Sequence, residues 1–290
     1  MIDASALTVP ATHKKEVTSM KKTGLGVALL TGASSGIGNA TAKALQHAGF
    51  RVFGTSRRTA TDRADGVTML TCDVTDDASV AKVVEEVLAK AGRIDLLVNN
   101  AGNGLLGAAE ESSTAQAQAL FDLNVFGVLR VTSAVLPVMR RQGKGRIINL
   151  SSVLGLIPAP YSALYSATKH AIEGYSESLD HELRTLGIRV VLVEPAYTRT
   201  SFGENIVKPD QSLDIYDSAR TGVNVILHRA METGDAPEIV AETILKAATA
   251  SVPKSRYAAG KKARQVSFLR RFVPASAFDK SLRKQNGLPL

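Results

Sequence analysis

The sequence predicts one α/β domain of the Rossmann-like type, a doubly wound parallel sheet with helices on both faces. Short apolar runs alternate with helical stretches along the chain. The run at Ile94–Val98 is apolar apart from Asp95, which is typical of a strand buried on both faces. A glycine turn at residues 31–38 joins the first apolar run to the first helix. Crossovers in such a fold are right-handed, and ligands bind at the carboxyl ends of the strands.

Each helix or strand is assigned from the spacing of its apolar residues and from the residues at its two ends. Gly49 ends the first helix and Gly92 the second, because glycine readily adopts the left-handed conformation found there. Strands are expected at residues 27–30, 52–55, 69–70, 94–98, 146–150, 189–193 and 257–259, and helices at 37–48, 76–91, 116–141, 162–186 and 239–250.

The globular domain is predicted to span residues 24–260, between a flexible leader at 1–23 and a basic tail at 261–290. Residues 196–236 differ from the rest of the domain because they are polar, poorly periodic and long. A long irregular insertion in a compact domain is usually a lid or a binding loop. We therefore expect a substrate lid at about 196–236.

The bulk composition suits a globular protein of a reducing, cytoplasmic compartment. The chain has 290 residues, 44% of them hydrophobic, which is enough for one large core. The single cysteine, Cys72, rules out an intramolecular disulfide, and there is no Cys/His cluster for a metal. No apolar run reaches the ~18 residues that span a bilayer. Residues 1–23 lack the apolar core of a secretory signal.

The net charge of +8 is concentrated near the C-terminus. From Lys254 onward there are ten Lys or Arg residues and one acid, Asp279. A basic segment with interleaved apolar residues could lie on an anionic membrane. We favour a solvated tail whose apolar residues cover the core or line a substrate mouth, because Pro274 interrupts any long amphipathic helix. Nucleic-acid binding is disfavoured because aromatic residues are few.

The glycine turn reads Thr31-Gly32-Ala33-Ser34-Ser35-Gly36-Ile37-Gly38. Its glycines allow a tight turn and a close approach of the backbone to a pyrophosphate, which the helix N-terminus would hold. The two serines add hydroxyl and amide donors. An ordinary strand–helix turn is the alternative, and the flanking strand and helix favour the nucleotide.

Tyr165 and Lys169 lie four residues apart, on one face of one predicted helix. A free tyrosine has a pKa of ~10, and a nearby cation favours its phenolate. The pair therefore predicts hydride transfer in which a tyrosine moves the proton. Ser152 follows the strand at 146–150, with Ser151 as the adjacent alternative.

These motifs, in this order, resemble those of the short-chain dehydrogenase/reductase family, in its compact branch. The resemblance covers roughly residues 24–260. Residues 146–185 and the basic tail also resemble the subgroup of 17-beta-hydroxysteroid and retinol dehydrogenases. The matching motifs are TGxxxGIG at 31–38, Asn99-Asn100-Ala101-Gly102, Asn124, Ser152, Tyr165-x-x-x-Lys169 and Pro195.

The resemblance implies an oxidoreductase whose catalytic residues are Asn124, Ser152, Tyr165 and Lys169. Ser152 would hydrogen-bond the substrate oxygen, Lys169 would also hold the nicotinamide ribose, and Asn124 would support a proton relay. Ala196 departs from the glycine that usually follows the family's proline. The implied cofactor contacts are Gly32, Ser34, Ser35, Gly36, Ile37, Gly38, Arg57, Asp73, Val74, Asn100, Ala101, Gly102, Tyr165, Lys169, Pro195, Thr198 and Thr200.

NADP(H) is favoured as the cofactor, with NAD(H) possible. Ser56 stands where NAD enzymes of this fold carry an acid, and Arg57 and Arg58 follow it. Arginine can form a fork of hydrogen bonds to a 2′-phosphate. The alternative is that both arginines are solvated loop charges. Asp73 resembles the family aspartate that contacts adenine, or it could cap the helix that begins near Asp76.

The expected substrate wall is Val153–Tyr161 together with residues 197–236, and its apolar start favours a small lipophilic carbonyl or alcohol. These side chains could instead pack against the lid. A catalytically silent nicotinamide-binding sensor and a membrane-surface lipid-binding protein are the alternative functions, and the complete catalytic set favours the enzyme. Family members commonly pair through two long helices, here about 116–141 and 162–186, so a homodimer or homotetramer is expected.

Overall fold

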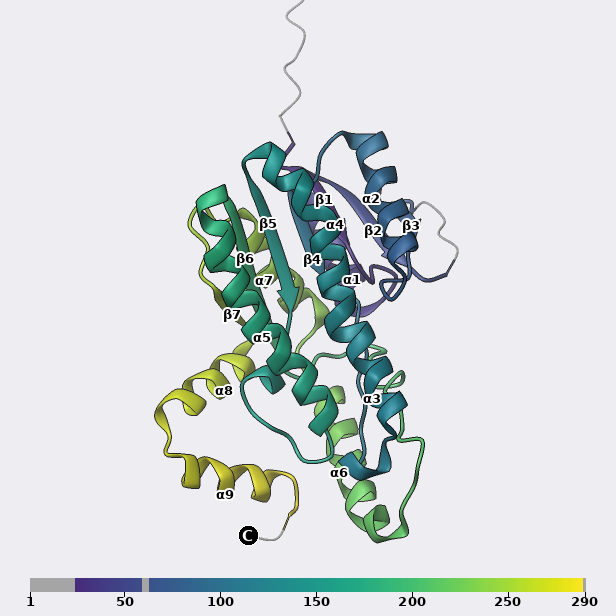
Figure 1. Ribbon diagram of the computed structural model, residues 1–290. Helices are drawn as coiled ribbons and strands as arrows, with labels where there is room; N and C mark the ends of the chain where they lie inside the picture. Colours follow the sequence, from purple (N-terminus) through teal and green to yellow (C-terminus); the bar gives the residue numbers. More distant parts are fainter. Residues whose placement is uncertain (1–23, 59–62, 289–290) are drawn as a thin grey trace, which may run out of the picture.

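The computed structural model describes residues 24–58 and 63–288, and it shows a seven-stranded sheet with helices on both faces (Figure 1). Every strand pairs in parallel with its neighbours. The predicted fold class is therefore confirmed. In spatial order the strands are β3 (Thr68–Thr71), β2 (Phe50–Ser56), β1 (Gly26–Leu30), β4 (Leu96–Asn99), β5 (Gly145–Leu150), β6 (Ile188–Pro195) and β7 (Arg256–Ala259).

The strand order reverses between β1 and β4. β1 pairs with β2 on one side and with β4 on the other, so the chain runs outward in both directions from this point. Ligands of open α/β sheets bind at such a switch point, beyond the carboxyl ends of the strands. The glycine turn follows β1, and Asn100 follows β4. The fold thus places both motifs at the switch point.

Two helical layers cover the sheet. The face covered by α1 (Gly36–His47) and α7 (Pro237–Thr249) buries Leu45, Val240 and Ile244. The opposite face is covered by α2 (Asp77–Ala91), α4 (Gly127–Gln142) and α5 (Ala163–Leu183), and the side chains that it buries include Val83, Val135 and Leu179.

The predicted helix at 116–141 is divided into α3 (Thr114–Phe121), a π-helical turn (Asp122–Phe126) and α4. By length and composition, Thr114–Gln142 is apolar enough to cross a membrane. Its apolar residues Val131, Val135 and Met139 are buried against the sheet, which accounts for that composition. The π turn directs Asn124 into the interior.

The last third of the chain is more helical than its sequence predicts. Residues 196–236 contain α6 (Asp217–Glu232), so the prediction of an irregular segment throughout is wrong. Val223 is the one fully buried residue of α6, and the neighbouring apolar residues Ile226 and Leu227 are only partly buried. The tail contains α8 (Lys261–Phe272) and α9 (Ala275–Gln285), and Pro274 separates them as predicted. The leader at 1–23 lies outside the described residues.

Candidate active site

The glycine turn is closed by contacts that leave no room for side chains. Gly32 has a φ of +68° and Gly36 of +51°, both in the left-handed region. A Cβ on Gly38 would lie 2.0 Å from the carbonyl oxygen of Gly32. The Asn100 Nδ2 donates to the carbonyl oxygens of Thr31 and Gly32, each at 2.9 Å. The turn is therefore fixed against the end of β4.

This turn presents its amides at the N-terminus of α1. Ser34 and Ser35 are exposed, Ile37 lies in the first helical turn, and the Ser35 side chain makes no capping hydrogen bond to the helix. The first N–H groups of a helix are an anion site when no side chain occupies them. The close backbone packing and the uncapped helix fit a dinucleotide pyrophosphate.

The ends of β2 and β3 carry the charges that would meet the adenosine. Arg57 and Arg58 are exposed directly after β2. The pKa of Asp73 is lowered chiefly by hydrogen bonds from Thr75, and the charge of Arg57 contributes. Asp76 rather than Asp73 caps α2, so the capping alternative for Asp73 is wrong.

Sequence reasoning missed Arg63 at this end of the site. Its Nη1 donates to the carbonyl oxygen of Ala33 in the glycine turn at 3.3 Å, and the guanidinium is paired with Asp65. Arg63 lies in a loop without periodicity, so no signal in the sequence singles it out.

The end of β4 continues into the other predicted cofactor contacts. The backbone N–H groups of Asn100 and Ala101 both donate to the Thr31 hydroxyl at 3.0 Å. A Cβ on Gly102 would lie 3.1 Å from Asn124 Oδ1, so this position is also crowded. Val74, in the loop between β3 and α2, is buried against Gly127.

Asn124 is 2% exposed and joins two segments of the site. Its Oδ1 accepts the Asn103 N–H at 2.9 Å, and its Nδ2 donates to the Asn103 carbonyl at 2.8 Å. The same Nδ2 donates to Thr168 Oγ1 at 3.2 Å, and that hydroxyl donates to the Tyr165 carbonyl at 2.7 Å. π turns are often found at functional positions, and this one links Asn124 to the helix of Tyr165.

Ser152 and Tyr165 face each other at the end of β5. Burial raises the pKa of Tyr165 to about 12, and its hydrogen bond with Ser152 acts in the opposite direction. Because burial prevails, the phenol is less acidic than free tyrosine, contrary to the expectation that a nearby cation lowers its pKa. The Ser151 hydroxyl instead lies beside Glu173.

Lys169 lies under the tyrosine ring. Its Nζ is 5.6 Å from the centroid of the Tyr165 ring and donates to the Leu150 carbonyl oxygen at 2.9 Å. Burial lowers the pKa of Lys169 to about 8, and the charge of Glu173 opposes this shift. The lysine is therefore mostly an ammonium ion at neutral pH.

A buried carboxylate cluster, which sequence reasoning missed, lies one helical turn behind Lys169. Arg256 of β7 pairs with Glu173 at 2.9 Å, with Glu177 at 2.9 Å and with Glu194 at 3.3 Å. Burial raises the pKa of Glu194 to about 7, and the nearby charge of Glu173 adds to this shift. The cluster comes from α5, β6 and β7, so spacing along the chain does not reveal it.

The segment after β6 returns to the glycine turn. Pro195 ends β6, and Thr198 is buried with its hydroxyl donating to the Ala196 carbonyl at 3.1 Å. A Cβ on Gly36 would lie 3.1 Å from the Thr200 side chain, so Thr200 lies directly over the turn. The predicted contacts from this segment therefore lie close to those from β1.

The lid supplies further residues to the substrate side. The Phe202 ring centroid is 6.0 Å from that of Tyr165. Tyr161 has a φ of +60°, a strained value for a non-glycine residue, and its ring contacts Tyr216. Strain of this kind is often found at functional positions, and no pattern in the sequence indicates it.

One buried carboxylate holds the lid in place. Glu111 is fully buried, accepts the Leu213 N–H at 2.9 Å and is paired with Arg220 of α6. Sequence reasoning missed this anchor because both partners lie about a hundred residues from Glu111 along the chain.

The proposed wall at 153–161 is only partly open to a ligand. Val153 and Ile157 are buried, whereas Leu154 and Leu156 are partly exposed. Leu154 and Leu156, together with the exposed Pro158, are therefore the candidates for substrate contact.

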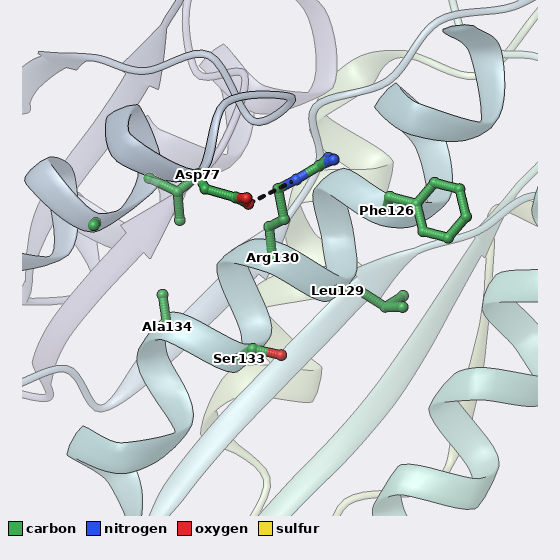
Figure 2. A pocket seen from close by; sticks show the side chains of 8 residues that line it. Asp77, Phe126, Leu129, Arg130, Ser133 and Ala134 are labelled. Atoms are coloured by element: carbon green, nitrogen blue, oxygen red, sulfur yellow. Dashed lines mark ion pairs between the residues drawn. The ribbon is translucent and has the colours of Figure 1, made fainter. Parts of the chain in front are cut away.

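Two surface pockets lie away from these residues. A pocket of about 440 Å³ is formed by α2 and α4, where Arg130 pairs with Asp77 at 2.9 Å (Figure 2). A neighbouring pocket of about 650 Å³ lies along α3, and the half-exposed Phe126 lines both. No predicted site residue lines either pocket, so neither is the candidate active site.

Comparisons with known proteins agree with this geometry. The family model described as short chain dehydrogenase matches residues 26–211. The chain is 44% identical over 179 residues to a 3-ketodihydrosphingosine reductase of Bacteroides thetaiotaomicron, a match that covers 62% of this chain and 66% of that protein. That share is just under two thirds of the relative's length.

Solved structures show the same fold. A short-chain dehydrogenase from Streptomyces avermitilis is 35% identical, with a TM-score of 0.76 over 91% of this chain and 98% of that one. A Burkholderia phymatum enzyme in complex with NAD is 25% identical, with a TM-score of 0.73 over 91% and 97%. A metagenomic short-chain oxidoreductase in complex with NADP is 30% identical, with a TM-score of 0.64 over 80% and 95%.

Proposed function

This chain belongs to the short-chain dehydrogenase/reductase family of oxidoreductases, and we propose that it is an NADP(H)-dependent enzyme that interconverts a lipophilic carbonyl compound and its alcohol. The observation that carries the proposal is the arrangement of Ser152, Tyr165 and Lys169 at the carboxyl edge of the sheet, beside the glycine turn. The relatives with bound NAD or NADP support a nicotinamide cofactor.

A nicotinamide held by the glycine turn and Lys169 would supply the hydride that reduces the carbonyl carbon. Tyr165 donates its phenolic proton to the carbonyl oxygen, so that an alcohol forms and a phenolate is left on the enzyme. The Ser152 hydroxyl donates a hydrogen bond to the same oxygen as negative charge develops there. The Lys169 ammonium stabilises the phenolate, and a solvent proton restores the phenol.

The high pKa of Tyr165 favours this direction at neutral pH. With a pKa of about 12, the residue carries its proton before the substrate arrives. Alcohol oxidation would require the phenolate as base, which is scarce at neutral pH. The phenol is therefore ready to act as the proton donor in reduction.

The preference for NADP(H) is supported by the end of β2, where Arg57 and Arg58 are exposed and no carboxylate of β2 faces a ribose. A lipophilic substrate is supported by Phe202 beside Tyr165 and by the partly exposed Leu154 and Leu156 of the predicted wall. The Bacteroides relative is named as a reductase of a keto compound, which agrees with the proposed class of substrate.

The proposed assembly is a homodimer or homotetramer. The outer face of α3 and α4 carries the half-exposed Phe126 and the two pockets, which suits helix pairing between copies. We propose a cytoplasmic location on the single free cysteine, Cys72.

The deciding experiment measures NADPH consumption by the full chain with a panel of lipophilic and small polar carbonyls. Tyr165→Phe is the matched blank, because it removes only the phenolic hydroxyl. We expect turnover of lipophilic carbonyls and a loss of about 10³-fold in the variant, with NADPH affinity nearly unchanged. Substantial residual activity of this variant would show that Tyr165 is not the proton donor. Tight NADPH binding without turnover of any carbonyl would favour the silent sensor.

A further inference from the structure

The α8–α9 tail, residues 261–288, lies across the substrate side of the molecule. Arg270 Nε of α8 donates to the Leu156 carbonyl oxygen at 3.2 Å, and Lys262 Nζ lies 5.8 Å from the Tyr197 ring centroid. Near its end, Gly287 approaches Ile226 of α6. Figure 1 shows α6, α8 and α9 beyond the carboxyl ends of the strands. The tail therefore connects the predicted substrate wall to the lid.

One face of α8 is used for this attachment. Ala263 is buried, and Arg270 makes the contact with Leu156, seven residues later on the same face of the helix. At 100° per residue, Phe268 and Phe272 lie on the opposite face. They are 61% and 63% exposed, and their ring centroids are 4.8 Å apart. Two aromatic rings in contact with each other thus face away from the domain.

The charge around these rings is strongly basic. Residues 261–288 contain eight Lys or Arg residues and one acid, Asp279. Arg264 and Arg271 flank the aromatic face of α8, and the Arg271 guanidinium lies 5.6 Å from the Phe272 ring centroid. Aromatic residues bordered by cations on a surface helix suit the boundary between lipid headgroups and acyl chains.

We propose that Phe268 and Phe272 insert into an anionic lipid surface while the surrounding Lys and Arg side chains contact its headgroups. This contact would place the mouth of the active site against the bilayer. Entry of a lipophilic substrate from that bilayer rests on the proposed function, whereas the docking itself does not. The proposal thereby reverses the preference, based on Pro274, for a solvated tail whose apolar residues cover the core or line a substrate mouth.

A second copy of the chain fits the same face poorly. Symmetric pairing through α8 would bring two equally basic tails together, and like charges repel at such a distance. An anionic bilayer instead complements the charge and accepts both rings.

The test is flotation of the full chain with vesicles of phosphatidylcholine alone and of phosphatidylcholine mixed with phosphatidylglycerol. We expect binding to the mixed vesicles, little binding to the neutral ones, and release at high salt. The double variant Phe268→Ser/Phe272→Ser should bind about tenfold more weakly. Val252→Ser is the matched control, because Val252 is 84% exposed in the loop before β7, at the opposite end of that strand from α8.

Circular dichroism and thermal melting establish that each variant folds. Absence of vesicle binding, equal binding to both vesicle types, or unchanged binding by the double variant would overturn the proposal. Binding to a nucleic-acid probe in place of vesicles, or a change in oligomeric state as the only effect of the double variant, would overturn it too. Flotation requires no turnover, so failure of docking and failure of the carbonyl reductase assay are separate results.

Discussion

The part of the site built by residues 24–195 and the part built by residues 196–288 are held in different ways. In the first part, Asn100, Asn124 and Lys169 all donate to backbone carbonyls, so each side chain is fixed by the fold itself. In the second part, the lid is held to the domain through the buried Glu111 and its partner Arg220. The catalytic residues are thus held by the backbone of the sheet and its helices, whereas the lid is a separate segment that is anchored to them.

The two parts also differ in what they expose. The exposed apolar side chains of the second part include Ile215 of the lid, Val225 of α6, and Phe268 and Phe272 of α8. The catalytic residues are partly or fully buried. Substitutions in the first part should therefore abolish the reaction for every substrate. Substitutions in the second part should instead change which substrates are accepted.

Among the substitutions that probe this comparison, Gly38→Ala is expected to have the largest effect. The added Cβ would meet the Gly32 carbonyl oxygen, so the turn must open. We expect NADPH affinity to fall roughly 100-fold, measured by fluorescence titration. Gly174→Ala is the control, because a Cβ there meets nothing within 4 Å. Equal affinity in both variants would show that the turn is not fixed as described.

Glu194→Gln tests whether the cluster behind Lys169 retains a proton. A carboxyl whose folded pKa is raised to about 7 binds its proton more tightly when folded, so the free energy of unfolding falls as the pH rises from about 4.5 to 7. In urea titrations over this pH range, the free energy of unfolding of the variant should therefore fall by about 2 kcal/mol less than that of the wild type. Glu177→Gln, which alters an exposed partner of Arg256, should keep it. Identical pH profiles for wild type and Glu194→Gln would refute the raised pKa.

Arg57→Ala should weaken the binding of NADPH much more than the binding of NADH. If the guanidinium binds the 2′-phosphate, NADPH affinity falls about tenfold while NADH affinity barely changes. Isothermal titration of both nucleotides gives the ratio, with Arg58→Ala measured beside it. A parallel loss for NADPH and NADH would mean that Arg57 does not recognise the phosphate.

The smallest effect is expected in the lid. Arg220→Met keeps much of the side-chain volume but removes the charge that pairs with Glu111. We expect KM for a lipophilic carbonyl to rise about fivefold with kcat nearly unchanged, because uniform binding is lost and the chemical step is not. A fall in kcat with KM constant would place the lid in the chemical step instead.

The sequence predicts the first part well because its signals are local. A glycine turn, a tyrosine and lysine one helical turn apart, and apolar strands each reveal their role within a few residues. The lid anchor, the Glu173–Glu194–Arg256 cluster and the strained Tyr161 depend on contacts between distant segments. α6 was missed although Val223, Ile226, Leu227 and Ala230 have helical spacing, because the segment around this stripe is largely polar.

Thr200 links the two parts, since it lies in the lid and directly over Gly36 of the nucleotide turn. A change in the lid that accompanies nucleotide binding can therefore be transmitted through this contact, as well as through the contact of Phe202 with Tyr165. Thermodynamic linkage then makes the two ligands reciprocal: the factor by which the nucleotide tightens substrate binding equals the factor by which the substrate tightens nucleotide binding. Measuring the cooperativity between nucleotide binding and substrate binding therefore tests the role of these contacts.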